Sequence, residues 1–333
     1  MTEPAKGRKK KPKRPVSTET PRAGRCAIVG RPNVGKSTLM NALLGQKLVI
    51  ATSKPGTTRS SVLAVYASDE PPTQIAFIDT PGMHRPKSAL GEVLVEQSKL
   101  GLSDADVVVF LVEAPSDRNL ESEREKERKV SKGMSDADRE VLALVKESKR
   151  PTVLAINKVD RLKDKRFLLP FIELLQKEHD FVAVLPISAQ RGTNLDSLIG
   201  EVRGHLPEGM LYDESFFTDR PERFFVAELI REAAMRGTFD EVPHGLACVI
   251  DQYIEKPGSV RIAATLIVEK ESHKSIVIGA QGAKIKQIGT EARQEIERFL
   301  EQKVFLELWV KVQPGWTSNP VHARRLVNEV EQS

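Results

Sequence analysis

Gly30-Arg31-Pro32-Asn33-Val34-Gly35-Lys36-Ser37 directly follows the apolar run 25–29, and this octet decides how the first part of the chain folds. It matches G-x-x-x-x-G-K-[ST], a loop between a strand and a helix whose backbone N–H groups surround phosphates. In that motif the lysine reaches the β- and γ-phosphates and the hydroxyl binds Mg²⁺. A fortuitous glycine-rich turn would give the same letters, so the octet alone indicates only a site for a nucleotide phosphate.

Three further motifs follow in the order that a guanine-nucleotide site requires. They are Asp79-Thr80-Pro81-Gly82, Asn157-Lys158-Val159-Asp160 and Ser188-Ala189, and each comes at the end of an apolar run. Asp79 ends a predicted strand, where its carboxylate can hold a water bound to Mg²⁺. A glycine at position 82 lets the backbone N–H approach the γ-phosphate closely. We therefore expect a domain that binds and hydrolyses GTP.

The motif at Asn157–Asp160 predicts the choice of base. A carboxylate at Asp160 accepts both N–H donors on the edge of guanine, whereas adenine presents its donor and its lone pair in the wrong places. The aliphatic stem of Lys158 can cover one face of the base, and the Ala189 N–H can donate to guanine O6. The alternative interpretation is a surface turn, which the preceding apolar strand disfavours.

The loop 51–60 is rich in Gly, Pro, Thr and Ser and lies where a switch segment closes over the phosphates. Of its candidates Thr57 and Thr58, we expect Thr58 to join Ser37 as a ligand of Mg²⁺. Met83 follows Gly82, at the place where small GTPases carry the glutamine that orients the attacking water. Methionine forms no useful hydrogen bond to water, so we expect slow intrinsic turnover. The residues expected to act directly on the reaction are Lys36, Thr58 and Gly82.

Composition places the protein among reduced, cytoplasmic proteins with two domains. The chain has 333 residues and two isolated cysteines without C-x-x-C spacing. Its most apolar run, 107–112, is too short to span a bilayer. The net charge is +5, but residues 1–25 hold nine Lys or Arg and two Glu, so they carry +7 and the remaining chain carries −2. We expect residues 1–22 to be a disordered basic tail that either aids solubility or attracts phosphates.

Residues 23–206 alternate apolar runs with helical periods, which is typical of a mostly parallel sheet with flanking helices. We expect strands at 25–29, 61–66, 74–78, 107–112, 152–156 and 182–186. Helices are expected at 37–44 and from near Ser135, Lys165 and Asn194, with Asn194 as an N-cap. The charged stretch 115–134 reads as a surface insertion and 207–221 as a packed linker, and 317–333 is expected to be a tail.

Residues 222–316 predict a second, α+β domain in the order α-β-β-α-α-β. Its parts are a helix at 222–235, alternating strands at 245–254 and 260–268, short helical segments at 276–278 and 284–288, a helix at 290–301 and a strand at 304–310. Gly279-Ala280-Gln281-Gly282 separates the two middle helices, as in a type II KH domain, where such a loop admits the backbone of about four nucleotides. The alternative is an ordinary helix-turn-helix. We expect RNA contacts from Gly279, Ala280, Gln281, Gly282, Lys284 and Lys286.

Over roughly residues 24–316 the chain resembles the Era family of bacterial GTPases. The segments that carry the resemblance are GRPNVGKS (30–37), GTTR (56–59), DTPGMHRPK (79–87), NKVD (157–160), ERFFVAELIRE (222–232), IGAQGAKIKQIG (278–289) and LELWVKV (306–312). The resemblance implies that the KH domain binds small-subunit (16S) ribosomal RNA near its 3′ end and that the protein assists assembly of the 30S subunit. It also implies K⁺ beside Mg²⁺ as a cofactor, with Asn33 as its ligand, a monomer, and peripheral association with the inner membrane.

The chain departs from the family pattern at three places. The insertion 115–134 is longer than the usual connection, and the sequence after Trp316 differs from the family ending. Ala280 and Gln281 stand where relatives often place a lysine, which lowers the electrostatic share of RNA affinity.

Two other functions compete with ribosome assembly. A GTPase of tRNA modification would share the nucleotide motifs, but its partner domains would be helical and lack G-x-x-G. A nucleotide-gated adaptor would instead hold a protein or membrane surface. The second domain shows no basic amphipathic helix of the kind that lies on membranes, which disfavours the adaptor.

Overall fold

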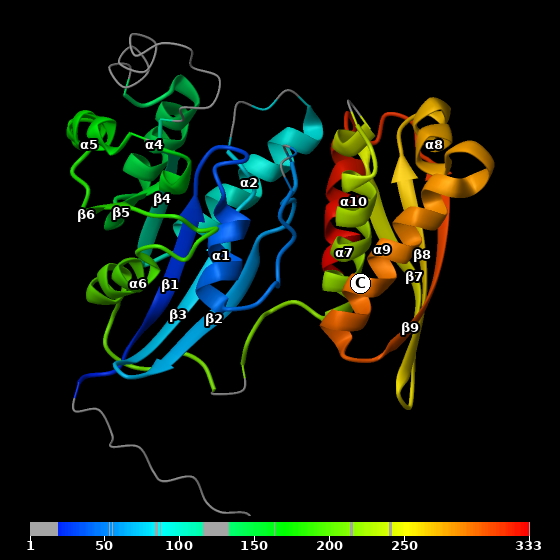
Figure 1. The fold of residues 1–333 in the computed structure, drawn as a ribbon, viewed down its shortest axis with the longest axis horizontal. Coiled ribbons are helices and arrows are strands. Elements are labelled where there is room, and N and C mark those ends of the chain that lie inside the picture. The colour runs from blue at the N-terminus through cyan, green and yellow to red at the C-terminus, as the bar shows by residue number, and fades with distance from the viewer. Residues whose placement is uncertain are drawn as a thin grey trace, which may run out of the picture.

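The computed structural model describes residues 19–332 apart from 53, 55, 84–85, 87, 116–132, 163, 214–215 and 240–241. The described residues form two domains that lie side by side and are joined by the segment after helix α6 (Leu195–Gly204) (Figure 1). Positions 1–18 of the predicted tail and 116–132 of the predicted insertion lie outside this part. Within it, no helix is long and apolar enough to cross a membrane.

The first domain is built on a six-stranded sheet in the order β2-β3-β1-β4-β5-β6, in which only β2 is antiparallel to its neighbour. Its strands are β1 (Arg22–Val29), β2 (Val62–Asp69), β3 (Pro72–Asp79), β4 (Val107–Glu113), β5 (Thr152–Asn157) and β6 (Ala183–Pro186). Its helices are α1 (Lys36–Leu44), α2 (Ala89–Ser103), α4 (Asp136–Ser148), α5 (Leu168–Gln176) and α6 (Leu195–Gly204), with 3₁₀ turns η1 (Val159–Arg161) and η2 (Lys165–Phe167). The predicted fold is confirmed, with strand ends that differ by a few residues.

Helices cover both faces of this sheet. The buried side chains of α1 and α6 belong to one hydrophobic cluster, and those of α4 and α5 belong to the other. Burial on both faces explains why the strands read as continuous apolar runs. Because the carboxyl ends of parallel strands meet at one edge, the motifs after β1, β3 and β5 come together there.

Helix α2 was not expected from the sequence. Ser88 caps it by accepting a hydrogen bond from the Gly91 N–H at 3.2 Å. The helix has two glycines and a serine among its buried positions, so its sequence lacks a continuous apolar stripe. Asn194 occupies the predicted N-cap position of α6, but its side chain makes no capping hydrogen bond. Its backbone is left-handed (φ 58°), and its side chain donates to the Pro186 carbonyl at 2.7 Å instead of capping α6.

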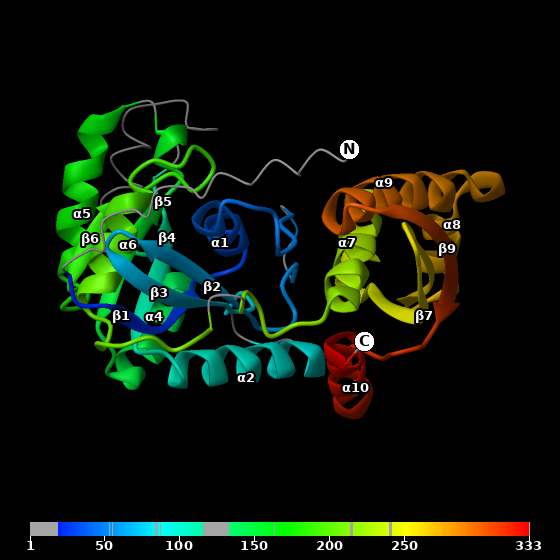
Figure 2. The ribbon, with the colours of Figure 1, turned by 90° about the horizontal axis from the view of Figure 1, so that it is seen from below.

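The second domain has a three-stranded sheet in the order β7-β8-β9, with β7 antiparallel and β9 parallel to β8. Its elements are α7 (Glu222–Arg236), η3 (Val242–Gly245), β7 (Ala247–Lys256), β8 (Ser259–Val268), α8 (Glu271–Ile278), η4 (Ala280–Gly282), α9 (Ala283–Leu300) and β9 (Lys303–Val312). The predicted order is confirmed, although the segments 284–288 and 290–301 form the single helix α9. Helix α7 lies on the side of the sheet that faces the first domain (Figures 1 and 2).

The chain ends in a helix, α10 (Pro320–Gln332), where we expected only a tail. Figure 2 shows α10 lying against the end of α2. Ala323, Leu326 and Val327 of α10 are buried together with Trp316 and with Leu90, Val93 and Leu94 of α2. Arg324 also pairs with Glu96 of α2 at 2.8 Å. These partners come from another domain, so local sequence could not reveal them.

Candidate active site and nucleic-acid interface

A pocket of about 620 Å³ opens at the carboxyl edge of the parallel strands, a size typical of ligand sites. The predicted residues that line it are Pro32, Asn33, Gly35, Lys36, Ser37, Thr58, Gly82 and Lys158. Thr57, the second choice in the switch loop, also lines it. The lining residues that were not predicted are Thr38, Ala51, Thr52, Gly56, Arg161 and Gln190. Most of these residues lie in the predicted switch loop or next to a motif. Their closeness in sequence to predicted site residues was the only signal that could have identified them.

The loop before α1 has a backbone that requires its glycines. Gly35 has a φ of 108°, and a Cβ there would lie 2.4 Å from Asn157 Nδ2. At Gly82 a Cβ would lie 2.8 Å from Pro32 Cα, so the two motifs approach each other as closely as backbones allow. Asn33 adopts a left-handed backbone with φ 63°. The result is a cradle of backbone atoms suited to phosphate oxygens.

Ser37, Thr58 and Asp79 converge at the base of the pocket. The Ser37 hydroxyl lies 2.9 Å from the Thr58 hydroxyl and donates to Asp79 Oδ2 at 2.8 Å. Thr58 donates to the same oxygen at 3.2 Å. Asp79 is fully buried, which raises its pKa, and among the described residues its Oδ1 has no hydrogen-bond partner. Two hydroxyls and a carboxylate with one unpartnered oxygen fit Mg²⁺, which prefers oxygen ligands.

Lys36 is buried at the phosphate end of the pocket. Its Nζ donates to the carbonyls of Gly30 at 3.1 Å and Arg31 at 3.2 Å. Burial lowers the pKa of Lys36 to about 8, with Asp79 opposing the shift and Arg31 adding to it. A polyanion bound in the cradle would restore the ammonium form. The site is therefore prepared for negative charge.

Asn157 joins the base end of the site to the phosphate end. Its Nδ2 donates to the Val34 carbonyl at 2.9 Å, and its Oδ1 accepts from the Ala189 N–H at 3.0 Å. The structure thus gives the Ala189 N–H to Asn157 where we expected guanine O6. Asp160 Oδ1 accepts from the Ser188 hydroxyl at 2.6 Å. The motif residues are brought together as predicted, but Asn157 acts as a link between loops.

Several predicted nucleotide residues direct their side chains away from the pocket. Val34 and Met83 are buried in the hydrophobic clusters, and Met83 donates its backbone N–H to the Gly30 carbonyl at 3.3 Å. Thr80 is fully buried and donates its hydroxyl to the Ile28 carbonyl at 2.8 Å. Arg31 pairs with Asp138 at 3.3 Å. These residues can therefore meet a nucleotide only through their backbone.

Glu113, at the end of β4, was not predicted and holds three cationic residues together. Its carboxylate pairs with Arg31 at 2.8 Å, with Lys158 at 3.1 Å and with Arg161 at 4.0 Å. Burial would raise the pKa of Glu113, but Lys158 and Arg31 outweigh burial and hold it below its ordinary value. Lys158 also donates to the Asn33 carbonyl at 2.7 Å. A lone acidic residue at the end of an apolar strand was the only signal in the sequence.

The G-x-x-G loop of the second domain lies between α8 and α9. Gly279, Gln281 and Gly282 all have positive φ, at 73°, 50° and 78°. A Cβ at Gly279 would lie 2.5 Å from Lys284 Cβ, whereas a Cβ at Gly282 would meet nothing within 4 Å. Gly279 is thus required by packing within the domain, and Gly282 faces open space. Ala280, Gln281 and Lys286 are exposed, and Lys284 is half-buried.

Comparison with known proteins finds the same two domains. The model of the 50S ribosome-binding GTPase family matches residues 25–158, and that of the KH domain matches residues 241–317. The GTPase Era of Ruminiclostridium cellulolyticum is 41% identical over 301 residues, which cover 90% of this chain and 94% of that protein. The GTPase Era of Lactobacillus helveticus is 42% identical, covering 92% of this chain and 95% of that protein.

Solved structures give the same result. A crystal structure of Era in complex with MgGDPNP and nucleotides 1506–1542 of 16S ribosomal RNA has a TM-score of 0.84 and 39% identity, covering 92% of this chain and 98% of that chain. A variant of Aquifex aeolicus Era bound to GDP·AlF₄⁻ has a TM-score of 0.83 and 39% identity, with the same coverage. Identity of this level over nearly the whole length, in both domains together, leaves one conclusion: the chain belongs to the Era family of GTPases.

Proposed function

We propose that this GTPase is a GTP-driven switch that binds 16S ribosomal RNA near its 3′ end through the KH domain and assists assembly of the 30S subunit. The observation that carries the proposal is the presence of a phosphate cradle and a G-x-x-G loop in one chain. The relative of the same fold that holds MgGDPNP and 16S nucleotides supports it. A tRNA-modification GTPase would lack the G-x-x-G loop, so the KH domain counts against that alternative.

In this proposal the first domain binds GTP between two loops. Backbone N–H groups of the octet and the Lys36 ammonium hold the phosphates, and Asp160 selects guanine. Ser37, Thr58 and Asp79 hold Mg²⁺, which when bound neutralises charge on the β- and γ-phosphates. The Gly82 N–H lies where it can approach the γ-phosphate. Met83 is buried, so its side chain leaves the attacking water without a partner and turnover is slow.

A second cation completes the proposed chemistry. Asn33 lines the pocket and has a left-handed backbone, so it lies at the rim of the phosphate cradle. A K⁺ ion held by Asn33 would add positive charge where the transition state develops negative charge. The family resemblance supports this role, and it also supports a monomeric, cytoplasmic protein that associates peripherally with the inner membrane.

The KH domain binds single-stranded RNA in this proposal. Gly282 and the first turn of α9 face solvent, so an RNA backbone can approach the loop and meet the helix N-terminus. Lys284 and Lys286 follow in that turn and supply positive charge. The ligand of this loop is expected to be the 3′-end sequence of the small-subunit RNA.

The test is the substitution Gly282→Asp, measured with an oligonucleotide of the 16S 3′ end. The carboxylate would enter the space that the phosphates need, so RNA affinity should fall at least about tenfold. Gly258→Asp is the matched control, because Gly258 has a similar φ of 75°, also faces open space and lies in the β7–β8 turn. It should bind RNA like the parent.

Folding must be verified first by circular dichroism and a thermal melt, since both substitutions strain a positive φ. Parental RNA affinity in folded Gly282→Asp would refute the proposed RNA site. A pull-down with and without nuclease separates the remaining alternative. Partners that survive nuclease would favour the adaptor, and loss of partners favours RNA.

A further inference from the structure

The expected Mg²⁺ ligand Thr58 is held on both sides by the second domain. Its neighbour Thr57 offers its carbonyl to Arg231 Nη2 of α7. Its other neighbour Arg59 donates to the carbonyls of Leu246 and His244, each at 2.8 Å. Thr58 itself points the other way, toward Ser37 and Asp79. The second domain thus holds the backbone of the switch loop on either side of Thr58, while the Thr58 hydroxyl faces the first domain.

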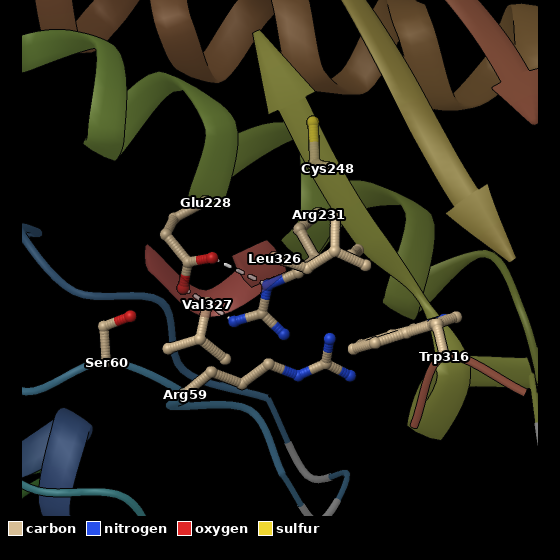
Figure 3. Close-up of a pocket in the computed structure, with 9 residues that line it drawn as sticks. Arg59, Ser60, Glu228, Arg231, Cys248, Trp316, Leu326 and Val327 are labelled. Atoms are coloured by element: carbon tan, nitrogen blue, oxygen red, sulfur yellow. Dashed lines mark hydrogen bonds and ion pairs between the residues drawn. The ribbon is translucent and has the colours of Figure 1, made fainter. Parts of the chain in front are cut away.

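Arg231 is fixed firmly enough to act as a support. Only 2% of its side chain is exposed. Glu228, one turn earlier on α7, accepts from its Nε at 2.7 Å and its Nη2 at 2.6 Å. This two-point contact sets the plane of the guanidinium, as Figure 3 shows. The Thr57 carbonyl therefore meets a donor whose position is already determined.

Arg59 makes the reciprocal contact from the first domain. It leaves the switch loop and enters the second domain, where its guanidinium carbon lies 5.3 Å from the centre of the Trp316 ring (Figure 3). Burial, together with the nearby positive charge of Arg231, lowers the pKa of Arg59 to about 9. Two buried guanidinium groups are costly, and an apolar pair of similar size would join the domains at least as well. The arginines are better explained by the loop geometry that they impose.

Other contacts hold the start of the same loop. Lys54 donates to the carbonyls of Met235 and Thr238 at the end of α7. The Ala51 N–H donates to Glu232 of α7 at 3.4 Å. The described part of the switch loop therefore lies along the surface of the second domain.

We propose that Arg231 and Arg59 are positioning residues of the GTPase centre, through which the second domain holds Thr58 at the Mg²⁺ site. The inference rests on the role proposed above for Thr58. In this arrangement the KH domain contributes to hydrolysis through its own side chains, apart from any RNA that it binds. Loss of the contacts made by Arg231 and Arg59 would leave the nucleotide pocket intact but would displace Thr58 from the Mg²⁺ site.

The first test compares Arg231→Met with Arg293→Met in the full-length protein. Arg293 is the matched control, since it also pairs with a glutamate of its own helix, Glu297 at 2.9 Å, but among the described residues no hydrogen bond or ion pair joins it to the first domain. Arg231→Met should lower kcat about tenfold and raise the Mg²⁺ concentration needed for half-maximal rate, with KM for GTP within about twofold. Parental kcat and Mg²⁺ dependence would overturn the proposal.

The second test does not depend on activity. Arg59 is only 7% exposed, so trypsin should cleave slowly between Arg59 and Ser60 in the parent and about tenfold faster in Arg231→Met. In a Trp309→Phe background, Trp316 is the only tryptophan of the chain, and its emission should change with the same substitution. Unchanged cleavage and unchanged emission would show that Arg231 does not hold the loop.

Two further variants keep the outcomes distinct. Thr58→Ala tests whether Thr58 is a ligand of Mg²⁺. If its kcat and Mg²⁺ dependence match the parent, the role proposed for Thr58 is refuted, and the positioning role of Arg231 and Arg59 with it. If Thr58→Ala lowers kcat and folded Arg231→Met does not, only the positioning role fails. Should Arg231→Met not fold, Arg59→Lys replaces it, because a lysine keeps the charge but cannot reach both carbonyls. It should show the same loss of kcat, and a parental kcat would contradict the proposal.

Discussion

Asn157 donates its side-chain amide to the carbonyl of Val34 at 2.9 Å, and so a base-recognition motif is tied directly to the phosphate loop. The same side chain also receives the Ala189 N–H. One amide therefore fixes the separation between the place for the base and the place for the phosphates. A nucleotide whose two ends match that separation binds to loops that are already in position, which lowers the entropy lost on binding.

Asp160→Asn should change the base preference from guanine toward xanthine. The amide presents a donor where guanine also donates, so GTP affinity should fall at least about 100-fold while affinity for xanthosine triphosphate rises. Titration with fluorescent nucleotides measures both. Asp164→Asn, which removes a nearby carboxylate paired with Arg166, is the control and should bind GTP like the parent. Equal GTP affinity in Asp160→Asn would exclude this role.

Replacing Na⁺ by K⁺ at constant ionic strength should raise the rate of GTP hydrolysis about tenfold. Met83 is buried and leaves the transition state without help from that side chain, so an added cation should have a large effect. Asn33→Ala should remove the difference between the two salts. Affinity for a non-hydrolysable GTP analogue serves as the control. Identical rates in both salts would exclude a K⁺ site.

Nucleotide binding should take up a proton when the pH lies above the pKa of free Lys36. Burial lowers that pKa to about 8, and bound phosphates must raise it again. Lys36 is then mostly charged in both states at pH 7, but mostly neutral in the free protein at pH 8.5. Calorimetric titrations of GDP in buffers of different ionisation enthalpy should show proton uptake that increases from pH 7 to 8.5. Uptake that does not vary with pH would contradict this prediction.

Removing residues 1–18 should flatten the salt dependence of RNA binding and leave GTP hydrolysis unchanged. This deletion keeps the ion pair between Glu19 and Arg203 at 2.9 Å. For single-stranded RNA, the log–log slope should become shallower by about 0.7 for every phosphate that the tail neutralises in the parent. The measurement is a series of RNA titrations at increasing salt. If both slopes agree, the basic tail serves solubility alone.

Most of the fold and most of the phosphate site could be predicted from local sequence. Strands buried on both faces read as apolar runs, and motif residues follow them in the chain, so the meeting of Ser37 and Asp79 could be predicted from the parallel topology. Thr58 was selected from two neighbouring threonines, and the structure brings it to the same carboxylate.

The features that escaped prediction depend on partners distant in sequence. Glu113 matters because Arg31 and Lys158 lie beside it in the loops that follow β1 and β5. The role of Asn157 as a link arises from its distance to Val34, which no motif encodes. Helix α10 is stabilised by α2, and the contacts of Arg59 and Arg231 exist only once both domains have folded. Composition and periodicity describe one element at a time, so they could not show such pairs.

The packing of α10 on α2 also bears on the order in which the protein is completed during synthesis. Leu90, Val93 and Leu94 leave the ribosome early, but the residues that cover them, Leu326 and Val327, follow much later in the chain. Until then α2 presents an apolar surface to the cell, in a domain whose sheet can already have formed. The first domain thus reaches its finished surface only after α10 has been translated.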